Sequence, residues 1–211
     1  MNARQIGPLM GILFVVLVVI AFIVSGETPD VDDSQQSIVS FYVDNDSEQQ
    51  IAASLLALGC VAFLFFLGTL RRALRVVAGD EGGLSTVALL GGLMMVVGAS
   101  IFAGIGFTLG DFADELQATP EAIVALNALN NDLFFPVAVG TAVFNLGLGL
   151  AVLRHGGLPR WLGWLALVVG IVGLTPAGFF AFLATGIVVI AASVALMRQA
   201  GASEPQPAGA P

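Results

Sequence analysis

Carboxylates gather around the stretch DNDSE, and they are the side chains of this chain that come nearest to a metal site. The weak candidates are Asp44, Asp46 and Glu48, because hard cations such as Ca²⁺ and Mg²⁺ prefer oxygen ligands. Their spacing fits no complete cation-binding loop. Helix capping is the alternative: Asp46 can cap the helix that follows and Asp33 a short helix before it, each with a glutamine three residues later. We therefore predict neither a metal centre nor a cofactor.

Ionisable side chains are missing from the interior of the long apolar runs. Ion-coupled transporters and intramembrane enzymes usually keep such a group at depth despite its cost, so we predict that the protein is not an enzyme. Asn145, in AVFNLGLG, is the only side-chain amide near the middle of a run. It can bond to a neighbouring helix. Alternatively, with Thr141 and the glycine stripes, it can line the path of a small carrier or channel subunit.

The composition is that of a membrane protein. Of 211 residues, 57% are hydrophobic and 10% are charged, and the mean hydropathy is +0.96. A helix needs about 20 apolar residues to cross a hydrocarbon core about 30 Å thick, and several runs reach that length. Because the lipid offers no partners to the backbone, such runs must be helical. The single cysteine, Cys60, excludes an intramolecular disulfide.

The runs predict an all-α, polytopic transmembrane bundle of six helices within a single membrane domain, residues 1–198. The last 40 apolar residues would make a helix of about 60 Å, so we expect Thr175 as N-cap and Pro176 as first helical residue to divide them. The first run could instead be a cleaved signal peptide. Residues 199–211 predict a disordered cytoplasmic tail. The six spans cover about 7–25, 50–70, 84–109, 134–153, 158–174 and 177–197.

Charge divides between the two sides of this threading. All seven cations are arginines and fall on one side, while twelve acids, including Asp114 and Glu115, fall on the other. Short cytoplasmic loops carry the excess of arginine. We therefore expect both termini in the cytoplasm of a bacterial cell, with Arg4 and Arg198 near them.

Two short amphipathic helices are expected on the outer face. In the first, Ile38, Phe41 and Tyr42 share one side. In the second, Thr119 is the cap and Pro120 the first residue, and the apolar side is formed by Ile123, Leu126 and Leu129. Such helices lie along the interface or over the mouth of the bundle, and we expect a ligand or partner to contact them. Residues 37–98 and 122–172 also suggest a direct repeat of helix, span, turn and span.

Small residues and tryptophans mark the remaining features. Small residues at helical spacing let helices approach closely, although a stripe of them can also form a groove for lipid. The stripes are Gly163, Ala166, Gly170 and Gly173, and Ser100 with Gly104. Indoles and arginines favour the interface, so we expect membrane anchors at Trp161, Trp164, Arg71, Arg72 and Arg75.

The run LFFPVAVGTAVFNLGLGLAVLRHGGLPRWLGWLALVVGIVGLTP, with the acidic loop and LALGCVAFLFFLGTLRRALR, resembles a group of uncharacterised six-helix integral membrane proteins of actinobacteria. The resemblance covers most of residues 6–197 and implies the fold and a plasma-membrane location, but no active site. We expect a non-enzymatic component that binds a lipid, a small apolar ligand or a partner protein. Its expected partners are the lipid bilayer and a second copy of the chain or another membrane protein, with no nucleic acid.

Overall fold

The computed structural model describes residues 3–79, 82–114 and 118–202, and all regular structure in them is α-helical. The side chains of Arg4 and Asp114, and the whole of Glu115, lie outside the described residues. The helices are α1 Ala3–Ser25, α2 Gln35–Asp44, α3 Asp46–Ala78, α4 Gly83–Asp114, α5 Pro120–Asp132, α6 Phe134–His155, α7 Arg160–Gly173 and α8 Gly178–Ala202.

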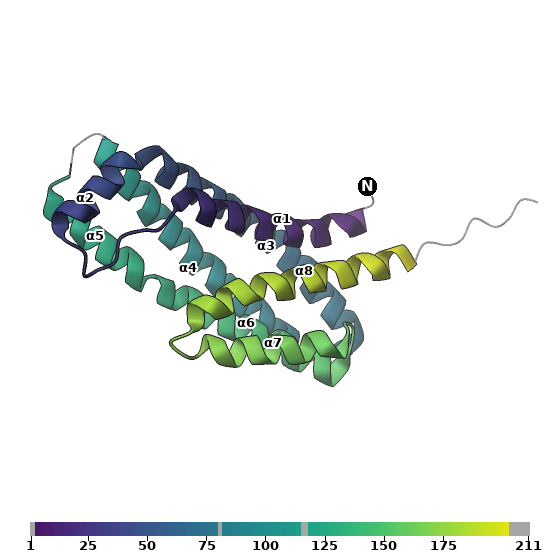
Figure 1. The fold of residues 1–211 in the computed structure, drawn as a ribbon. Coiled ribbons are helices and arrows are strands. Elements are labelled where there is room, and N and C mark those ends of the chain that lie inside the picture. The colour runs from purple at the N-terminus through teal and green to yellow at the C-terminus, as the bar shows by residue number, and fades with distance from the viewer. Residues whose placement is uncertain (1–2, 80–81, 115–117, 203–211) are drawn as a thin grey trace, which may run out of the picture.

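The long helices form one bundle with two distinct ends (Figure 1). Helix α3 packs between α1 and α4, α6 packs between α4 and α7, and α8 contacts α1, α6 and α7. The short helices α2 and α5 lie together at one end. Both the start of α1 and the end of α8 lie at the other, so the chain returns to the end from which it sets out.

Within the described residues, five helices are long and apolar enough to cross a membrane, with α5 and α6 counted as one helix over Pro120–His155. They indicate a multi-pass membrane protein. Helix α7 is apolar but has 14 residues, so it is only about 21 Å long. Five of the six predicted spans therefore correspond to helices long enough to cross a membrane, whereas the predicted span over residues 158–174 is the shorter helix α7, and the count of six stays a prediction.

Several helix boundaries differ from the predicted ones. Helix α3 runs from Asp46 to Ala78, well past the arginines, because arginine is itself a good helix former. Pro176 is not the first residue of α8 but lies in the turn before it, where the Thr175 hydroxyl donates to the Val172 carbonyl (2.7 Å) and accepts from the Ala177 amide (3.2 Å). Residues 199–202, predicted to belong to the disordered tail, are helical.

Glycines bring helix backbones together. A Cβ atom added to Gly140 of α6 would lie 2.7 Å from the Met95 Cα of α4, and one on Gly147 would lie 2.9 Å from the Ala88 Cα. The predicted stripe of α7 is buried against α6 in the same way, with Gly170 next to Leu146. The predicted stripe of Ser100 and Gly104 is wrong as a packing surface, because both residues are exposed.

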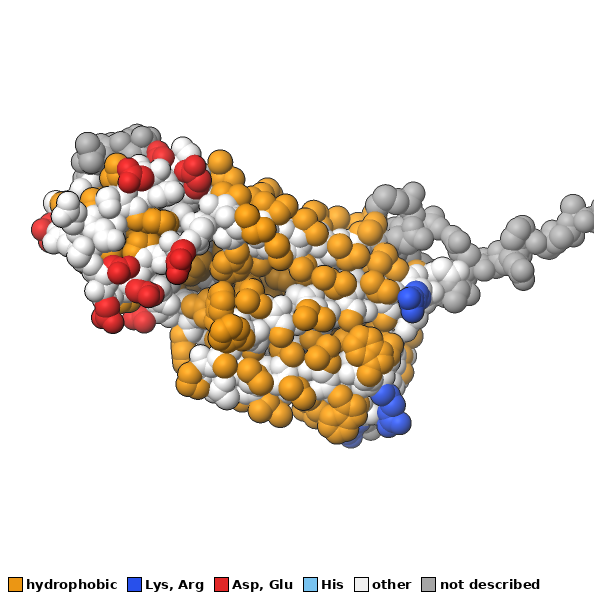
Figure 2. Space-filling model, viewed as in Figure 1, with side chains coloured by type: hydrophobic (Ala, Val, Ile, Leu, Met, Phe, Trp, Pro, Cys, Tyr) orange, Lys and Arg blue, Asp and Glu red, His pale blue; other side chains and the backbone are white. Residues whose placement is uncertain are grey.

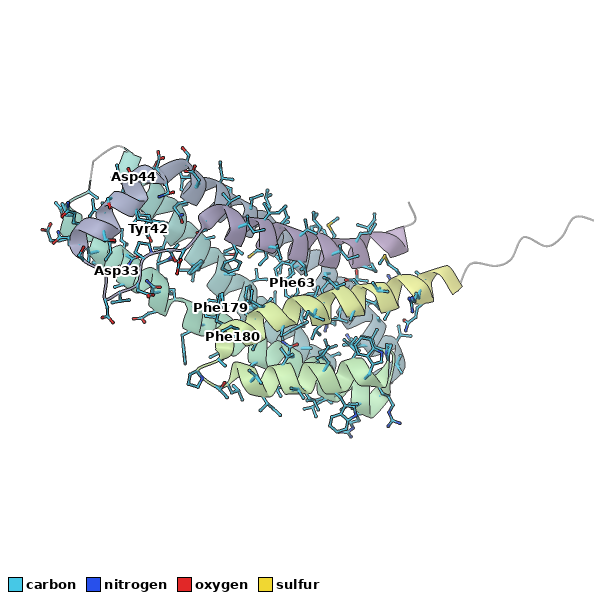
Figure 3. All side chains as sticks on the ribbon, viewed as in Figure 1. Asp33, Tyr42, Asp44, Phe63, Phe179 and Phe180 are labelled. Atoms are coloured by element: carbon cyan, nitrogen blue, oxygen red, sulfur yellow. The ribbon has the colours of Figure 1, made fainter. Side chains whose placement is uncertain are left out.

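Phenylalanine rings fill the middle of the bundle. Phe63 is fully buried, and its ring centroid lies 4.5 Å from that of Phe14 in α1 and 5.6 Å from that of Phe144 in α6. It lies well along the bundle from Tyr42 at the cap, whereas Phe179 and Phe180 lie near the α7–α8 turn (Figure 3). The core of the bundle is therefore apolar along most of its length.

Apolar side chains also cover the outside of the bundle between its ends. Figure 2 shows hydrophobic side chains over the middle of this face, carboxylates at the end that carries α2 and α5, and arginines at the opposite end. We call these the acidic end and the arginine end. Exposed members of the apolar belt include Val16, Ile20, Leu58, Val61, Leu90, Val97, Ile171 and Ile187.

Candidate ligand site at the acidic end

Helices α2 and α5 begin with side-chain caps that differ in one case from the predicted ones. Thr119 caps α5 as expected, and its side chain accepts a hydrogen bond from the Ala122 amide. The cap of α2 is Ser34, not Asp33, and the Ser34 hydroxyl accepts from the Ser37 amide at 3.2 Å. The Asp33 carboxylate instead accepts from the Asp30 amide at 2.9 Å, which tightens the turn before the helix.

The two short helices bury a small apolar cluster against α4. Ile38 and Tyr42 of α2, Ile123 of α5 and Leu109 of α4 are all at least 96% buried. Phe41 and Leu126 are half-buried against this cluster. The cluster fixes the pair of helices to the bundle as a cap.

Leu129 was predicted on the apolar face of α5, but 48% of it is exposed. The buried stripe of α5 is instead formed by Ile123, Asn127 and Asn130. This stripe follows i, i+4 and i+7, whereas the predicted face followed i, i+3 and i+6. Helix α5 therefore turns amides towards the bundle.

A hydrogen-bond network joins these amides to two other segments. The Tyr42 hydroxyl donates to Asn127 Oδ1 at 2.7 Å, and Asn127 Nδ2 donates to the Pro29 carbonyl at 3.3 Å. Asn131 Nδ2 donates to the same carbonyl at 3.4 Å. Because Tyr42 and Asn127 are each 1% exposed, these bonds are shielded from water and stabilise the cap more than surface bonds would.

Gln49 closes the acidic end from the side of α3. Its Nε2 donates to the Ser25 carbonyl at 2.8 Å, and its Oε1 accepts from the Ser25 hydroxyl at 3.1 Å. Gln49 and Asp46 were predicted to cap α3, but the residue before the helix, Asn45, makes no side-chain cap bond. The amide of Gln49 instead fixes the end of α1 to α3.

A cavity of about 80 Å³ lies beneath these contacts, between α1, α3 and α4. We call it the cap pocket. Its walls are mainly small and apolar, and its polar atoms come from the residues at the acidic end. The lining residues on which the site depends are Phe22, Gln49, Ala53, Phe102, Gly106 and Asn130.

Asn130 lines the cap pocket and carries one unpaired acceptor. The residue is 8% exposed, and its Oδ1 atom is buried with no hydrogen-bond partner in the described part of the chain. Leaving a buried acceptor unpaired costs about 1–3 kcal/mol. A ligand with a donor group at this point would remove that cost.

The described carboxylates at the acidic end do not gather into a metal site. Among the described residues, no three His, Cys, Asp or Glu side chains come together in a way that could hold a metal ion, so Asp44, Asp46 and Glu48 form no such group.

Burial raises the pKa of Tyr42 to about 12. Hydrogen bonds from its own backbone and from Gln35 hold the pKa of Glu121 below its usual value.

Asn145 lies away from the cap pocket, in the core of the bundle. Its Nδ2 donates to Thr185 Oγ1 of α8 at 2.7 Å and to the Thr141 carbonyl at 2.8 Å. Asn145 and Thr141 have no exposed surface. The amide therefore joins α6 to α8, as expected for an interhelical bond.

The predicted membrane anchors are placed at the arginine end or close to it. Trp161 and Trp164 are 58% and 62% exposed and follow Arg160 at the start of α7. Arg72 and Arg75 are exposed and Arg71 is half-buried, on the last turns of α3. Their role as anchors stays a prediction, as do the repeat and the resemblance to actinobacterial proteins.

Comparison with protein-family models, curated proteins and solved structures gives no match for this chain. The site therefore rests on its own geometry. Sequence reasoning placed Ile38, Phe41, Tyr42, Ile123 and Leu126 on the apolar faces of the two short helices, and the structure packs them together. Their predicted contact with a ligand or partner stays a prediction. The amides of α5 were missed. The signal that could have found them is the spacing of Asn127, Asn130 and Asn131 at i, i+3 and i+4 of an otherwise apolar helix.

Proposed function

We propose that this protein is a non-enzymatic component of a bacterial plasma membrane that binds a narrow apolar ligand with one hydrogen-bond donor in the cap pocket. The observation that carries the proposal is the Oδ1 atom of Asn130, which has no partner among the described residues and belongs to a residue that lines a mainly apolar cavity. Ligand sites in proteins combine apolar walls with a few polar groups that set orientation. The ligand class is a lipid chain or small molecule that ends in a hydroxyl or amide.

The size of the cap pocket restricts the ligand. Its volume of about 80 Å³ is smaller than the roughly 150 Å³ of an apolar cavity that holds benzene. An alkyl chain end therefore fits better than an aromatic ring. Alkyl contacts with Phe22, Ala53 and Phe102 would supply affinity, and Asn130 would select a donor.

The proposed threading has six crossings, with α7 as a short crossing and α2 and α5 on the outer face. In support, the described arginines and both chain ends lie at one end of the bundle and the described carboxylates at the other (Figures 1 and 2). Arginine-rich short loops face the cytoplasm. Cysteine variants of Asp33 and Arg198 in intact cells test this threading: an impermeant thiol reagent should modify position 33 and leave position 198 unmodified.

A photoreactive long-chain alkanol and its parent alkane test ligand binding in the reconstituted full chain. We expect both probes to label residues that line the cap pocket. Asn130→Leu should reduce the alkanol signal about fivefold, which is the effect of one hydrogen bond worth about 1 kcal/mol, and should leave the alkane signal unchanged.

A matched pair of glycine variants separates occupancy of the pocket from general damage. Neither Gly106 nor Gly104 of α4 has an atom within 4 Å of the place where a Cβ would be, but only Gly106 lines the cap pocket. Gly106→Leu should abolish labelling and Gly104→Leu should preserve it. Equal labelling of the two variants would contradict the proposal.

A further inference from the structure

The arginine end carries a second hollow, which lies along α3 between α1 and α8. Its volume is about 950 Å³, and it is lined by Pro8 of α1, Phe65, Gly68 and Arg72 of α3, and Leu196 of α8. A further hollow of about 500 Å³ adjoins it on the α4 side and shares Gly68, Arg72 and Val76 with it. We call the pair the arginine groove.

Apolar and cationic side chains both line this groove along α3. Phe65 and Val76 are 62% and 79% exposed, and Arg71, Arg72 and Arg75 line the hollow on the α4 side. Phe65 and Arg72 are seven residues apart, or about 10.5 Å along a helix. Phe65 therefore lies about two helical turns from Arg72, on the same side of α3.

Two arginines of the groove, Arg72 and Arg75, are exposed to a ligand. Arg71 Nε is buried and has no hydrogen-bond partner in the part of the chain that the structure describes. The described carboxylates visible on the face of Figure 2 lie at the opposite end of the bundle. Asp80 and Glu81 follow α3 in the sequence and lie outside the described residues.

We propose that the arginine groove binds an anionic phospholipid, with the phosphate on Arg71, Arg72 and Arg75 and an acyl chain along Phe65. Guanidinium groups bind phosphate oxygens in pairs, and basic pockets between membrane helices bind lipid head groups in this way. A free phosphate would contact the arginines alone, whereas a phospholipid also places an acyl chain against Phe65. The groove is at the other end of the bundle from the cap pocket, so failure of one proposal would leave the other unaffected.

Gly68 is one of the residues that line the groove. No atom lies within 4 Å of the place where its Cβ would be, so this glycine is not required for helix packing. A glycine in a helix interior costs about 1 kcal/mol relative to alanine. A larger side chain at position 68 would therefore fill the groove without displacing other atoms of the protein.

Binding of labelled phosphatidylglycerol to the purified full chain in neutral detergent tests the proposal, with phosphatidylcholine as the uncharged probe and inorganic phosphate as competitor. Each arginine near the lipid contributes about fivefold in affinity, so Arg72→Gln should weaken phosphatidylglycerol binding about fivefold. The triple variant Arg71→Gln, Arg72→Gln, Arg75→Gln should weaken it about 100-fold. The control Arg160→Gln removes an arginine at the start of α7 and should leave binding unchanged.

Gly68→Leu is the second variant, with Gly104→Leu as its matched control on a different helix. Gly68→Leu should weaken phosphatidylglycerol binding while the protein stays folded, and Gly104→Leu should have no effect. Equal binding of the two lipids, or unchanged binding in Gly68→Leu, would overturn the proposal. Competition by inorganic phosphate as strong as that by lipid would also overturn it, because the groove would then recognise a free anion.

Discussion

At the acidic end, the segment between α1 and α2 is fixed by Asn127 and Asn131, which lie 98 and 102 residues further along the chain. At the arginine end, the described turns depend mainly on glycine conformation. Gly79 ends α3 with φ +58°, and Gly156 and Gly157 join α6 to α7 with φ +83° and +84°. One tertiary hydrogen bond reaches the α6–α7 turn, from Gln199 Nε2 of α8 to the Gly157 carbonyl at 2.7 Å. The acidic end therefore depends more on tertiary hydrogen bonds, and the arginine end more on local backbone conformation.

The difference explains where each candidate site can form. The walls of the cap pocket come from α1, α3, α4 and α5 and from the segment after α1, which meet only in the folded chain. The arginine groove instead lies along a single helix, α3, with α1, α4 and α8 beside it. The first site is suited to a buried apolar ligand and the second to a lipid that stays in the bilayer.

The largest effect is expected at the centre of the cap. Asn127→Ala removes the acceptor of the buried Tyr42 hydroxyl and a donor to the Pro29 carbonyl, and should lower the free energy of opening the cap by about 2–3 kcal/mol. Hydrogen exchange of residues 26–44 measures this opening. Asn131→Ala, which removes an exposed partner of the same carbonyl, should cost less than about 1 kcal/mol; equal effects would show that burial does not set the strength of the cap.

At the arginine end, Gly157→Ala should destabilise the α6–α7 turn by about 1–2 kcal/mol, because a Cβ is unfavourable at positive φ. The added Cβ would also lie 3.1 Å from Val77 Cγ2. Thermal unfolding in detergent measures the effect. The control is Gly83→Ala, where the Cβ meets open space and φ is ordinary, and it should be neutral or slightly stabilising.

Tyr42→Phe should cost about 1 kcal/mol in the same exchange experiment, since Asn127 Oδ1 loses its buried donor. The double variant with Asn127→Ala should cost no more than Asn127→Ala alone plus a few tenths of a kcal/mol, because the two residues share one bond. Additive effects would show that Tyr42 and Asn127 stabilise the cap independently.

The cap should also respond to alkaline pH. Burial raises the pKa of Tyr42 to about 12 in the folded protein, whereas the pKa of an unfolded tyrosine is about 10. Folding therefore favours the neutral phenol. Its contribution to the free energy of unfolding is complete below pH about 10 and is lost as pH rises through about 12. Tyr42 is the only tyrosine in the chain, so the absorbance of tyrosinate reports it directly; a folded-state midpoint near 10 would contradict its burial.

The smallest effect is expected at the exposed edge between α2 and α5. Gln35 Nε2 donates to Glu121 Oε1 at 3.4 Å, and both side chains are exposed. Gln35→Ala should change the free energy of opening the cap by less than about 0.5 kcal/mol. A larger loss in hydrogen exchange would show that surface contacts, and not the buried network, hold the two helices together.

Much of the fold can be predicted from the amino-acid sequence because its signals are local. The apolar runs predict the long helices, Thr119 and Pro120 predict the start of α5, and the segregation of charge predicts two unlike ends. Helix boundaries are less predictable. The arginines after Leu70 do not end α3, and Pro176 lies two residues before the first residue of α8. Such ends depend on which neighbours satisfy the backbone.

The candidate site is less predictable. The apolar contacts of Ile38, Tyr42 and Ile123 follow from helical periodicity, but the rotation of α5 does not. Leu129 and Asn130 are neighbours in sequence, and packing against the bundle decides that the amide is buried and the leucine exposed. The cap pocket likewise needs residues from α1, α3, α4 and α5 at once.

Hydropathy and charge act on each segment separately, so the amino-acid sequence alone predicts an apolar helical bundle with an acidic end and an arginine end. Which polar groups pair and which remain free depends on the packing of the helices. Tyr42 donates to Asn127, 85 residues away in sequence, while Asn130 Oδ1, in a residue that lines a cavity, has no partner among the described residues. Hydrogen bonds require specific atoms at specific distances, and only the packed helices set those distances.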